Sequence, residues 1–263
     1  MIATTLRSKW RKVMLLNTPQ KATSRHDATG EARPSPRGSR LSGKAVSEGL
    51  TSSPSMDSIH QREARAFIER WDKDYVDGAE LLAAVRGACP KCSDQDLRAA
   101  LDAVAHGPFT TASACAAAAL CQMAGLGNPP DTAYKLAREG RPLTEPQWFA
   151  LIAGYSYNWI THTGLRACYF DFDDQQYADR IRVYDTIGAK AAAAVLRDAD
   201  QAFGEAGPPP TVVERVEARS DELLRRFDED LYPRFKACGN EIVTCIYLYA
   251  LDHPGDFKGM DDQ

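Results

Sequence analysis

The segment Asn158-Trp159-Ile160-Thr161-His162-Thr163-Gly164-Leu165-Arg166-Ala167-Cys168-Tyr169-Phe170-Asp171 says most about the fold of this chain. An acidic run follows it, and then four apolar residues recur at spacings that place them on one helix face. They are Tyr177, Ile181, Tyr184 and Ile187. Gly188 is expected to end that helix, because glycine adopts the left-handed conformation without steric cost. A second helix is expected over 189–203, which makes Ile187-Gly188-Ala189 a tight corner between antiparallel helices.

Charge is distributed unevenly along the 263 residues. Residues 1–56 contain ten Lys and Arg against three Asp and Glu, a net charge of +7. Residues 57–263 hold the remaining 22 basic and 33 acidic residues, a net charge of −11. Such a body repels the phosphates of nucleic acids and membranes and attracts basic surfaces. We therefore expect no direct nucleic-acid binding and no membrane association. Plain solubility is the alternative reason for the charge.

Both ends of the chain are predicted to be disordered tails. Residues 1–56 are rich in Ser, Pro, Gly, Arg and Lys, and such a composition cannot bury enough apolar surface to fold. We predict a disordered basic tail over 1–56 and a second disordered tail over 259–263. The long tail is interpreted as upstream sequence read from a start codon placed too early, or as a basic arm that binds nucleic acid. Seven cysteines without a disulfide pattern, and the lack of an apolar run of 18 residues, indicate a cytoplasmic protein.

Helical periodicity fills the rest of the chain, and no segment reads as a strand. We predict an N-terminal helical region over 57–128, with the Ala-rich segment 111–126 as its central buried helix. Gly127-Asn128-Pro129-Pro130 is the predicted boundary. A second helical domain is expected over 129–258. The fold class is therefore all-α, a multi-helix orthogonal bundle of two packed helical regions.

Within the second domain, Thr144-Glu145-Pro146-Gln147 is expected to start an aromatic helix. Thr211 is expected to cap a helix that runs to Phe227, and a closing helix is expected over 241–251. The predicted core contains the large apolar side chains of these helices: Trp148, Phe149, Ile152, Tyr155, Trp159, Tyr169, Phe170, Tyr184, Ile187, Leu196, Phe227, Tyr232, Ile246 and Tyr249.

Several of these motifs fall in the order found in one protein family. The matching positions are Ile160, Gly164, Leu165, Tyr169, Phe170, the corner at 187–189, Phe227-Asp228-Glu229-Asp230-Leu231-Tyr232 and His253-Pro254-Gly255-Asp256-Phe257. Over roughly residues 131–257 the chain resembles the bacterial DNA-mimic proteins of the DMP type, a helical domain family. The family's hallmark loop reads Asn-Asn-Gly-Gly, and this chain has Thr161, His162 and Thr163 in place of the first three residues.

The resemblance implies a function. It implies a homodimer that binds the basic surface of a transcription factor, of helix-turn-helix type, and keeps it from DNA. The motif loop is His162, Thr163 and Gly164. Carboxylates on a rigid helical body can copy the regularly spaced charges of DNA. The residues predicted to bind the partner are Asp171, Asp173, Asp174, Asp179, Asp228, Glu229 and Asp230.

Less specific interpretations stand beside this one. The acidic residues also fit a solvated helix face with i,i+4 pairs, for which Arg215, Arg219, Arg225 and Arg226 are available. The protein is then a helical interaction or immunity-type protein whose partner is unrelated to DNA. The third class is an enzyme of unrecognised chemistry centred on His162 and Cys168.

The sequence itself favours no catalytic or metal site. Cys89-Pro90-Lys91-Cys92 lacks the second pair that a zinc site needs, and we interpret it as two ordinary thiols at a loop-to-helix junction. His162 is expected to donate a hydrogen bond at a helix C-terminus. We predict that the protein is not an enzyme and that it uses neither a cofactor nor a metal ion.

Overall fold

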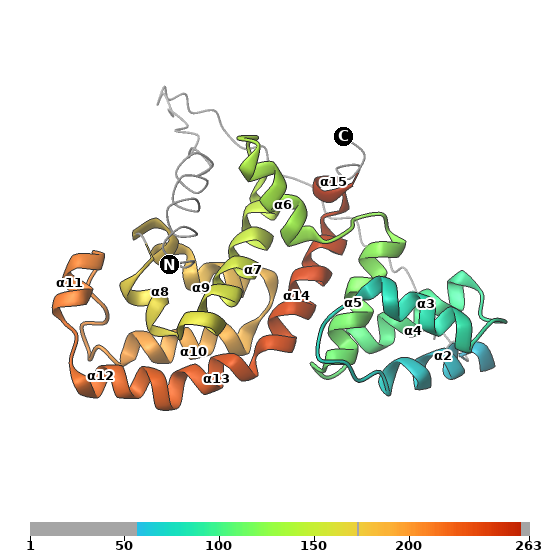
Figure 1. Cartoon of the computed structure of the whole chain (residues 1–263), viewed down its shortest axis with the longest axis horizontal. Coiled ribbons are helices and arrows are strands. Elements are labelled where there is room, and N and C mark those ends of the chain that lie inside the picture. The colour runs from blue at the N-terminus through green and yellow to red at the C-terminus, as the bar shows by residue number, and fades with distance from the viewer. Residues whose placement is uncertain (1–56, 173, 259–263) are drawn as a thin grey trace, which may run out of the picture. The chain divides into compact units, whose positions relative to one another are not determined.

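The structure is a computed structural model that describes residues 57–172 and 174–258 (Figure 1). All regular elements within those ranges are helices, which confirms the predicted all-α class. None of these helices is both long enough and apolar enough to span a bilayer. The two predicted tails, 1–56 and 259–263, lie outside the described residues.

The first apolar core lies among α2 (Ile59–Glu69), α3 (Gly78–Ala88), α4 (Asp94–Ala105) and α5 (Thr111–Met123). α4 begins at Ser93 with a capping box, in which the hydroxyl of Ser93 accepts the N–H of Asp96 and the carboxylate of Asp96 accepts the N–H of Ser93. α5 is buried from Ala112 to Cys121, as the sequence predicts for a central helix. Its small side chains allow neighbouring helices to approach it closely.

The second apolar core lies among the remaining helices, which follow α5 in chain order. They are α6 (Pro129–Arg138), α7 (Glu145–Thr163), α8 (Arg166–Phe170), α9 (Asp174–Ile187), α10 (Lys190–Gln201), α11 (Val212–Glu217), α12 (Asp221–Arg226), the π-helix η1 (Phe227–Leu231), α13 (Tyr232–Ala237), α14 (Gly239–Asp252) and α15 (Pro254–Phe257). α7 starts where the sequence predicts a helix start, and the structure adds a capping box between Thr144 and Gln147. Most of the predicted core residues are buried. Tyr155, Trp159, Phe170, Tyr232 and Tyr249 are instead half-buried against the edge of this core.

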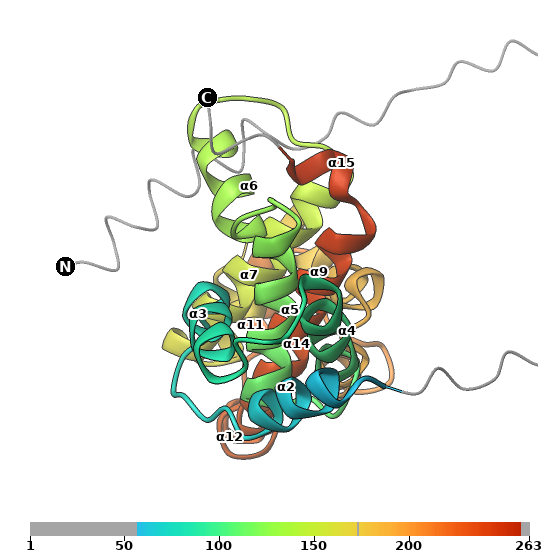
Figure 2. The ribbon, with the colours of Figure 1, turned by 90° about the vertical axis from the view of Figure 1, so that its right-hand side faces the viewer.

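α14 contacts both cores. It lies beside α5 in both views of the ribbon (Figures 1 and 2). The hydroxyl oxygens of Ser113 and Thr244 are 3.3 Å apart, and the thiol of Cys121 donates to the carbonyl of Tyr247 across 3.3 Å. Leu251 of α14 also packs against the first core. One helix therefore supplies apolar surface to two sets of helices.

The predicted corner between two helices is present at Gly188. This residue has a φ of 88°, in the left-handed region that favours glycine. The N–H of Ala189 donates to the carbonyl of Tyr184 across 2.8 Å and closes the turn. α9 thus ends at Ile187, and α10 starts three residues later.

Two expectations for the C-terminal part are wrong. The single helix expected from Thr211 to Phe227 is interrupted between α11 and α12. Ser220 starts the second helix, because its hydroxyl accepts the N–H of Leu223 and caps a new first turn. The closing helix begins at Gly239 and is longer than predicted.

The N-terminus of α10 is capped by a residue of another helix. Ala189 has no side chain that can accept a hydrogen bond. The carboxylate of Glu241 in α14 accepts the N–H groups of Ala191 (2.9 Å) and Ala192 (3.1 Å) instead. Glu241 is 6% exposed, so this contact is shielded from water. It also places a negative charge at the positive end of the helix dipole.

We predict that Glu241→Ala lowers the free energy of unfolding by about 2–4 kcal/mol, because one buried and one partly buried N–H group lose their acceptor. Urea denaturation followed by circular dichroism measures this loss. The control is Glu222→Ala, at an exposed position in the first turn of α12, which is expected to change stability by no more than about 0.5 kcal/mol. Equal effects of the two substitutions would contradict the capping role.

Candidate functional site

The aromatic stretch folds around Tyr169 of α8, which is fully buried. Its ring centroid lies 5.6 Å from that of Tyr177 in α9, 5.6 Å from that of Phe203 and 4.8 Å from that of Phe227 in η1. Its hydroxyl donates to the carboxylate of Asp200 in α10 across 2.7 Å, so the buried polar group is satisfied. Four segments that are distant in sequence therefore meet at one side chain.

Two buried arginines enclose the ring of Tyr177. The guanidinium carbons of Arg180 and Arg215 each lie 3.6 Å from its centroid, and these side chains are 6% and 0% exposed. Arg180 also donates to the hydroxyl of Tyr177 (3.0 Å) and forms an ion pair with Asp200. A desolvated cation–π contact is worth about 2 kcal/mol, which offsets part of the cost of burying the charge. We call these residues, together with Tyr169, the arginine–tyrosine cluster.

The position of Arg215 corrects the sequence interpretation. We counted it among the arginines available for pairs on a solvated face, but it is buried in α11. Its guanidinium donates to the carbonyls of Tyr169 (2.7 Å), Pro209 (3.2 Å) and Pro210 (2.6 Å). Proline has no N–H, so the proline loop offers acceptors without competing donors. Arg215 thereby fixes α11 and the loop before it against the end of α8.

Of the predicted acidic turn, the structure describes the side chains of Asp171 and Asp179. Asp171 follows α8 and is exposed. Asp179 in α9 is largely buried, with a side-chain exposure of 15%, and its carboxylate lies 3.8 Å from the guanidinium of Arg182. Asp173 lies outside the described residues. Asp174 opens α9, and its side chain lies outside them as well.

The second acidic set, Asp228, Glu229 and Asp230, lies in the π-helix η1. α12, η1 and α13 follow one another without a break, so these carboxylates occupy the middle of one helical rod. Pro233 follows shortly after and cannot donate to the carbonyl four residues earlier, which favours a locally wider turn. Turns of this kind are frequent at functional sites in proteins.

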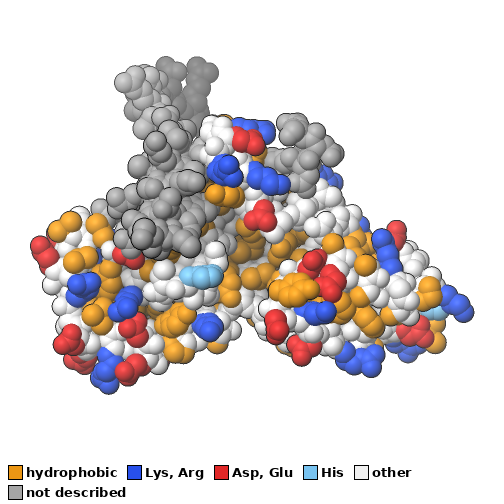
Figure 3. Space-filling view, viewed as in Figure 1, with side chains coloured by type: hydrophobic (Ala, Val, Ile, Leu, Met, Phe, Trp, Pro, Cys, Tyr) orange, Lys and Arg blue, Asp and Glu red, His pale blue; other side chains and the backbone are white. Residues whose placement is uncertain are grey.

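Each carboxylate of η1 has an arginine within ion-pair distance. Asp228 pairs with Arg166 of α8 (3.4 Å), Glu229 with Arg225 (4.0 Å) and Asp230 with Arg234 (3.7 Å). All six side chains are between 44% and 70% exposed. Acidic and basic side chains accordingly alternate along the edge of the molecule where α12 lies (Figure 3). Exposed pairs of this kind contribute only about 0–1 kcal/mol each, so their partners are replaceable.

The structure brings the motif loop next to η1. Gly164 has a φ of 89°, and a Cβ at this position would lie 4.0 Å from Oδ1 of Asp228. The hydroxyl of Tyr232 donates to the carbonyl of Thr161 across 2.9 Å. Thr163 lines a hollow of about 420 Å³ that Arg166 and Asp171 also line. We call Thr163, Gly164, Arg166 and Asp171, together with the η1 carboxylates Asp228, Glu229 and Asp230, the loop–rod surface.

Asp179 lies away from the loop–rod surface. The arginine that it contacts, Arg182, also binds Glu145 at the first residue of α7. The motif loop is at the last residue of the same helix. A helix of 19 residues is roughly 28 Å long, so the two ends of α7 are well separated.

His162 and Cys168, the residues of the enzyme interpretation, lie in different surroundings. Nδ1 of His162 is 2.7 Å from the carbonyl of Asn158, one turn earlier in α7, and the side chain is exposed, as expected for a helix C-terminus. Cys168 is 1% exposed, and burial raises the pKa of its thiol to about 12. No hydrogen bond joins the two side chains within the described residues, and no cluster of metal ligands is found there. Cys89 ends α3 and Cys92 precedes α4, which is the loop-to-helix junction that we predicted.

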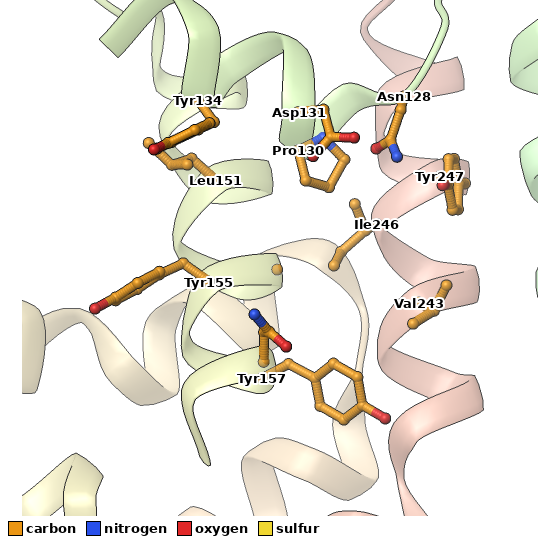
Figure 4. Close-up of a pocket in the computed structure, with 12 residues that line it drawn as sticks. Asn128, Pro130, Asp131, Tyr134, Leu151, Tyr155, Tyr157, Val243, Ile246 and Tyr247 are labelled. Atoms are coloured by element: carbon orange, nitrogen blue, oxygen red, sulfur yellow. The ribbon is translucent and has the colours of Figure 1, made fainter. Parts of the chain in front are cut away.

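A groove that the sequence did not reveal lies between α6, α7 and α14 (Figure 4). Its volume is about 390 Å³. Pro130 and Asp131 lie above it, Tyr155 and Tyr157 come from α7, and Val243, Ile246 and Tyr247 come from α14 (Figure 4). The sequence signal that could have indicated it is the number of tyrosines in α7 and α14, which is larger than a closed core needs.

Comparison with protein-family models, with curated proteins and with solved structures finds no significant match to this chain. The resemblance to the DNA-mimic proteins of the DMP type therefore stays a prediction that rests on the sequence motifs of residues 131–257. The loop–rod surface, the arginine–tyrosine cluster and the groove come from the structure.

We predict that Cys168 is inert toward iodoacetamide, because a thiol with a pKa near 12 is ionised in roughly one molecule in ten thousand at pH 8. Cys89 and Cys92, which are half-buried, provide the internal comparison and should be alkylated first. Mass spectrometry of tryptic peptides after timed alkylation of the folded protein measures both. Labelling of Cys168 at the rate of Cys89 would contradict its burial and would favour the enzyme interpretation.

Proposed function

We propose that this chain is an acidic helical protein-binding module that binds a basic surface of a partner protein through its loop–rod surface. By resemblance to the DMP-type proteins, the partner is a DNA-binding regulator of helix-turn-helix type, and binding keeps it from DNA. Two segments support the proposal. The motif loop and the acidic π-helix were singled out separately in the sequence, 64 residues apart at Gly164 and Asp228, and they are neighbours in the structure.

Charge supports the class of partner. The net charge of −11 over residues 57–263 favours the approach of a basic protein and disfavours nucleic acid. The carboxylates of Asp228, Glu229 and Asp230 are exposed, so a partner can reach them without unfolding the rod. Their own arginine partners are exposed too, and the weak existing pairs can be exchanged for pairs with arginines or lysines of the partner.

The geometry favours a compact patch of mixed charges rather than a long row of carboxylates that copies DNA phosphates. Five acidic residues and four basic ones, Arg225, Arg226, Arg234 and Lys236, alternate along the rod from Ser220 to Ala237. Affinity in such a patch comes from several carboxylates acting together, with arginines that orient them. A partner therefore needs cationic side chains that fit between those arginines, which gives the surface selectivity among basic proteins.

We predict that the immobilised chain captures a basic DNA-binding protein from its native lysate at low salt, and that duplex DNA releases it. The triple substitution Asp228→Asn, Glu229→Gln and Asp230→Asn should weaken binding of the captured protein by about 1–3 kcal/mol, or roughly 5- to 150-fold in Kd, without changing the melting temperature. Binding should also weaken steeply as salt rises.

The matched control removes three exposed carboxylates elsewhere, at Asp72, Asp74 and Asp252, and should bind as the unmodified chain does. Two results would contradict the proposal. One is that the triple variant in η1 binds its partner as tightly as the control. The other is that the captured protein is not released by DNA, which would favour the helical interaction or immunity-type class.

A further inference from the structure

The groove between α6, α7 and α14 has the features of a peptide-binding site. Leu151, Gly154 and Ile246 line it, and we call these three residues its floor; four tyrosines line it as well. Gly154 allows α6 to lie close to α7, because a Cβ there would lie 3.1 Å from Pro130. Hydrophobic side chains gather over α7 and α14 on the face shown in Figure 3. Amphipathic helices commonly bind into apolar grooves of this kind between helices.

The polar side chains around the groove indicate the charge of the occupant. Among the twelve residues that line it, Asp131 is the one charged side chain. It is exposed and forms no ion pair with a described residue. The side chain of Asn128 does not cap α6, although it occupies the capping position. A carboxylate and an amide at the rim of an apolar groove fit a segment with apolar residues on one face and basic residues on the other.

The chain contains one such segment outside its described residues. In residues 6–16 the apolar side chains Leu6, Trp10, Val13 and Met14 recur at spacings of four, three and one, which a helix would place on one face. The intervening residues include four cations: Arg7, Lys9, Arg11 and Lys12. The rest of 1–56 has no other tryptophan, phenylalanine or tyrosine, so this segment differs from the composition that predicts a disordered tail.

The connection to the body allows the contact. The 42 residues from Asn17 to Ser58 join the segment to α2. A polar chain of that length has a root-mean-square end-to-end distance of about 35 Å, so the segment can reach the groove. Tethering also raises its local concentration to the millimolar range, which makes a weak contact sufficient.

We propose that residues 6–16 bind the groove of the same chain, with Trp10 and its apolar neighbours against the floor and the basic residues toward Asp131. The proposal goes beyond the partner-binding function, because the groove and the loop–rod surface share no residue. The proposal gives part of the basic tail, residues 1–56, a binding site on the acidic residues 57–263. Either proposal can fail while the other holds.

Limited trypsin digestion of the full chain tests this contact. Cleavage after Arg11 and Lys12 should be about tenfold slower than in a Trp10→Glu variant, because a bound segment must first dissociate. Cleavage after Lys21 and Arg25, outside the segment, should be the same in both proteins. Trp10→Glu leaves all described residues unchanged, so loss of protection cannot come from unfolding of the body.

Substitutions of residues that line the groove provide a second test. Asp131→Lys together with Val243→Glu should also remove the protection of Arg11 and Lys12, while Asp74→Lys, an exposed charge reversal between α2 and α3, should preserve it. The circular dichroism melt of each variant shows that the body is folded. Digestion is repeated at a tenfold lower chain concentration.

Three results would overturn the proposal. Equal cleavage of the unmodified chain and the Trp10→Glu variant would mean that the segment does not bind. Protection that survives the groove substitutions would place the segment elsewhere on the molecule. Protection that disappears on dilution would assign the groove to the tail of a second copy.

Discussion

The ring of Tyr177, enclosed by the guanidinium groups of Arg180 and Arg215, is the contact on which the C-terminal core depends. Arg180 connects α9 to Asp200 of α10, and Arg215 connects α11 to the carbonyl of Tyr169 at α8. Burying two cations is costly unless each has fixed acceptors and aromatic faces. Because the acceptors come from separate segments, those segments must all be in place for the charges to be satisfied. The arginine–tyrosine cluster can therefore form only when all of these segments are in place.

The arginine–tyrosine cluster also fixes the positions of the residues of the loop–rod surface. α8 carries Arg166 at its first residue, is followed by Asp171, and has Tyr169 between them. Phe227, which packs on Tyr169, is the residue directly before Asp228. The exposed groups are thus one or a few residues away from buried groups with fixed positions. Inside the core the arginines have several fixed partners, whereas at the surface the ion pairs are exposed and exchangeable. Exposed charges that can exchange their partners, held in place by a rigid core, are suited to binding another charged surface.

The sequence predicted local features well, because these depend on neighbouring residues. The helix start at Thr144, the cap at Thr211 and the corner at Gly188 are signalled within four residues. The burial of α5 follows from its composition alone. Arg215 could not be placed in this way, since its acceptors lie in the proline loop and, 46 residues away, at Tyr169. The break before Ser220 was missed because the apolar spacing continues across it.

The candidate site was less predictable than the fold for the same reason. Asp228 and Gly164 each carry a local signal, but nothing local shows that they are neighbours. Asp171 and Asp179 are close in sequence, and the structure places one at the surface and the other largely inside. The groove is formed by three helices whose apolar faces each resemble ordinary core faces, so no single segment reveals it.

The coupling between Tyr177 and Arg215 tests the central role of the cluster most directly. A double-mutant cycle with Tyr177→Leu and Arg215→Met, measured by urea denaturation, separates their mutual contact from their other interactions. If the ring and the guanidinium stabilise each other in a desolvated site, the coupling free energy is about 1–2 kcal/mol. If the two substitutions are instead additive within about 0.5 kcal/mol, the central role of the cluster is contradicted, and other contacts hold these helices together.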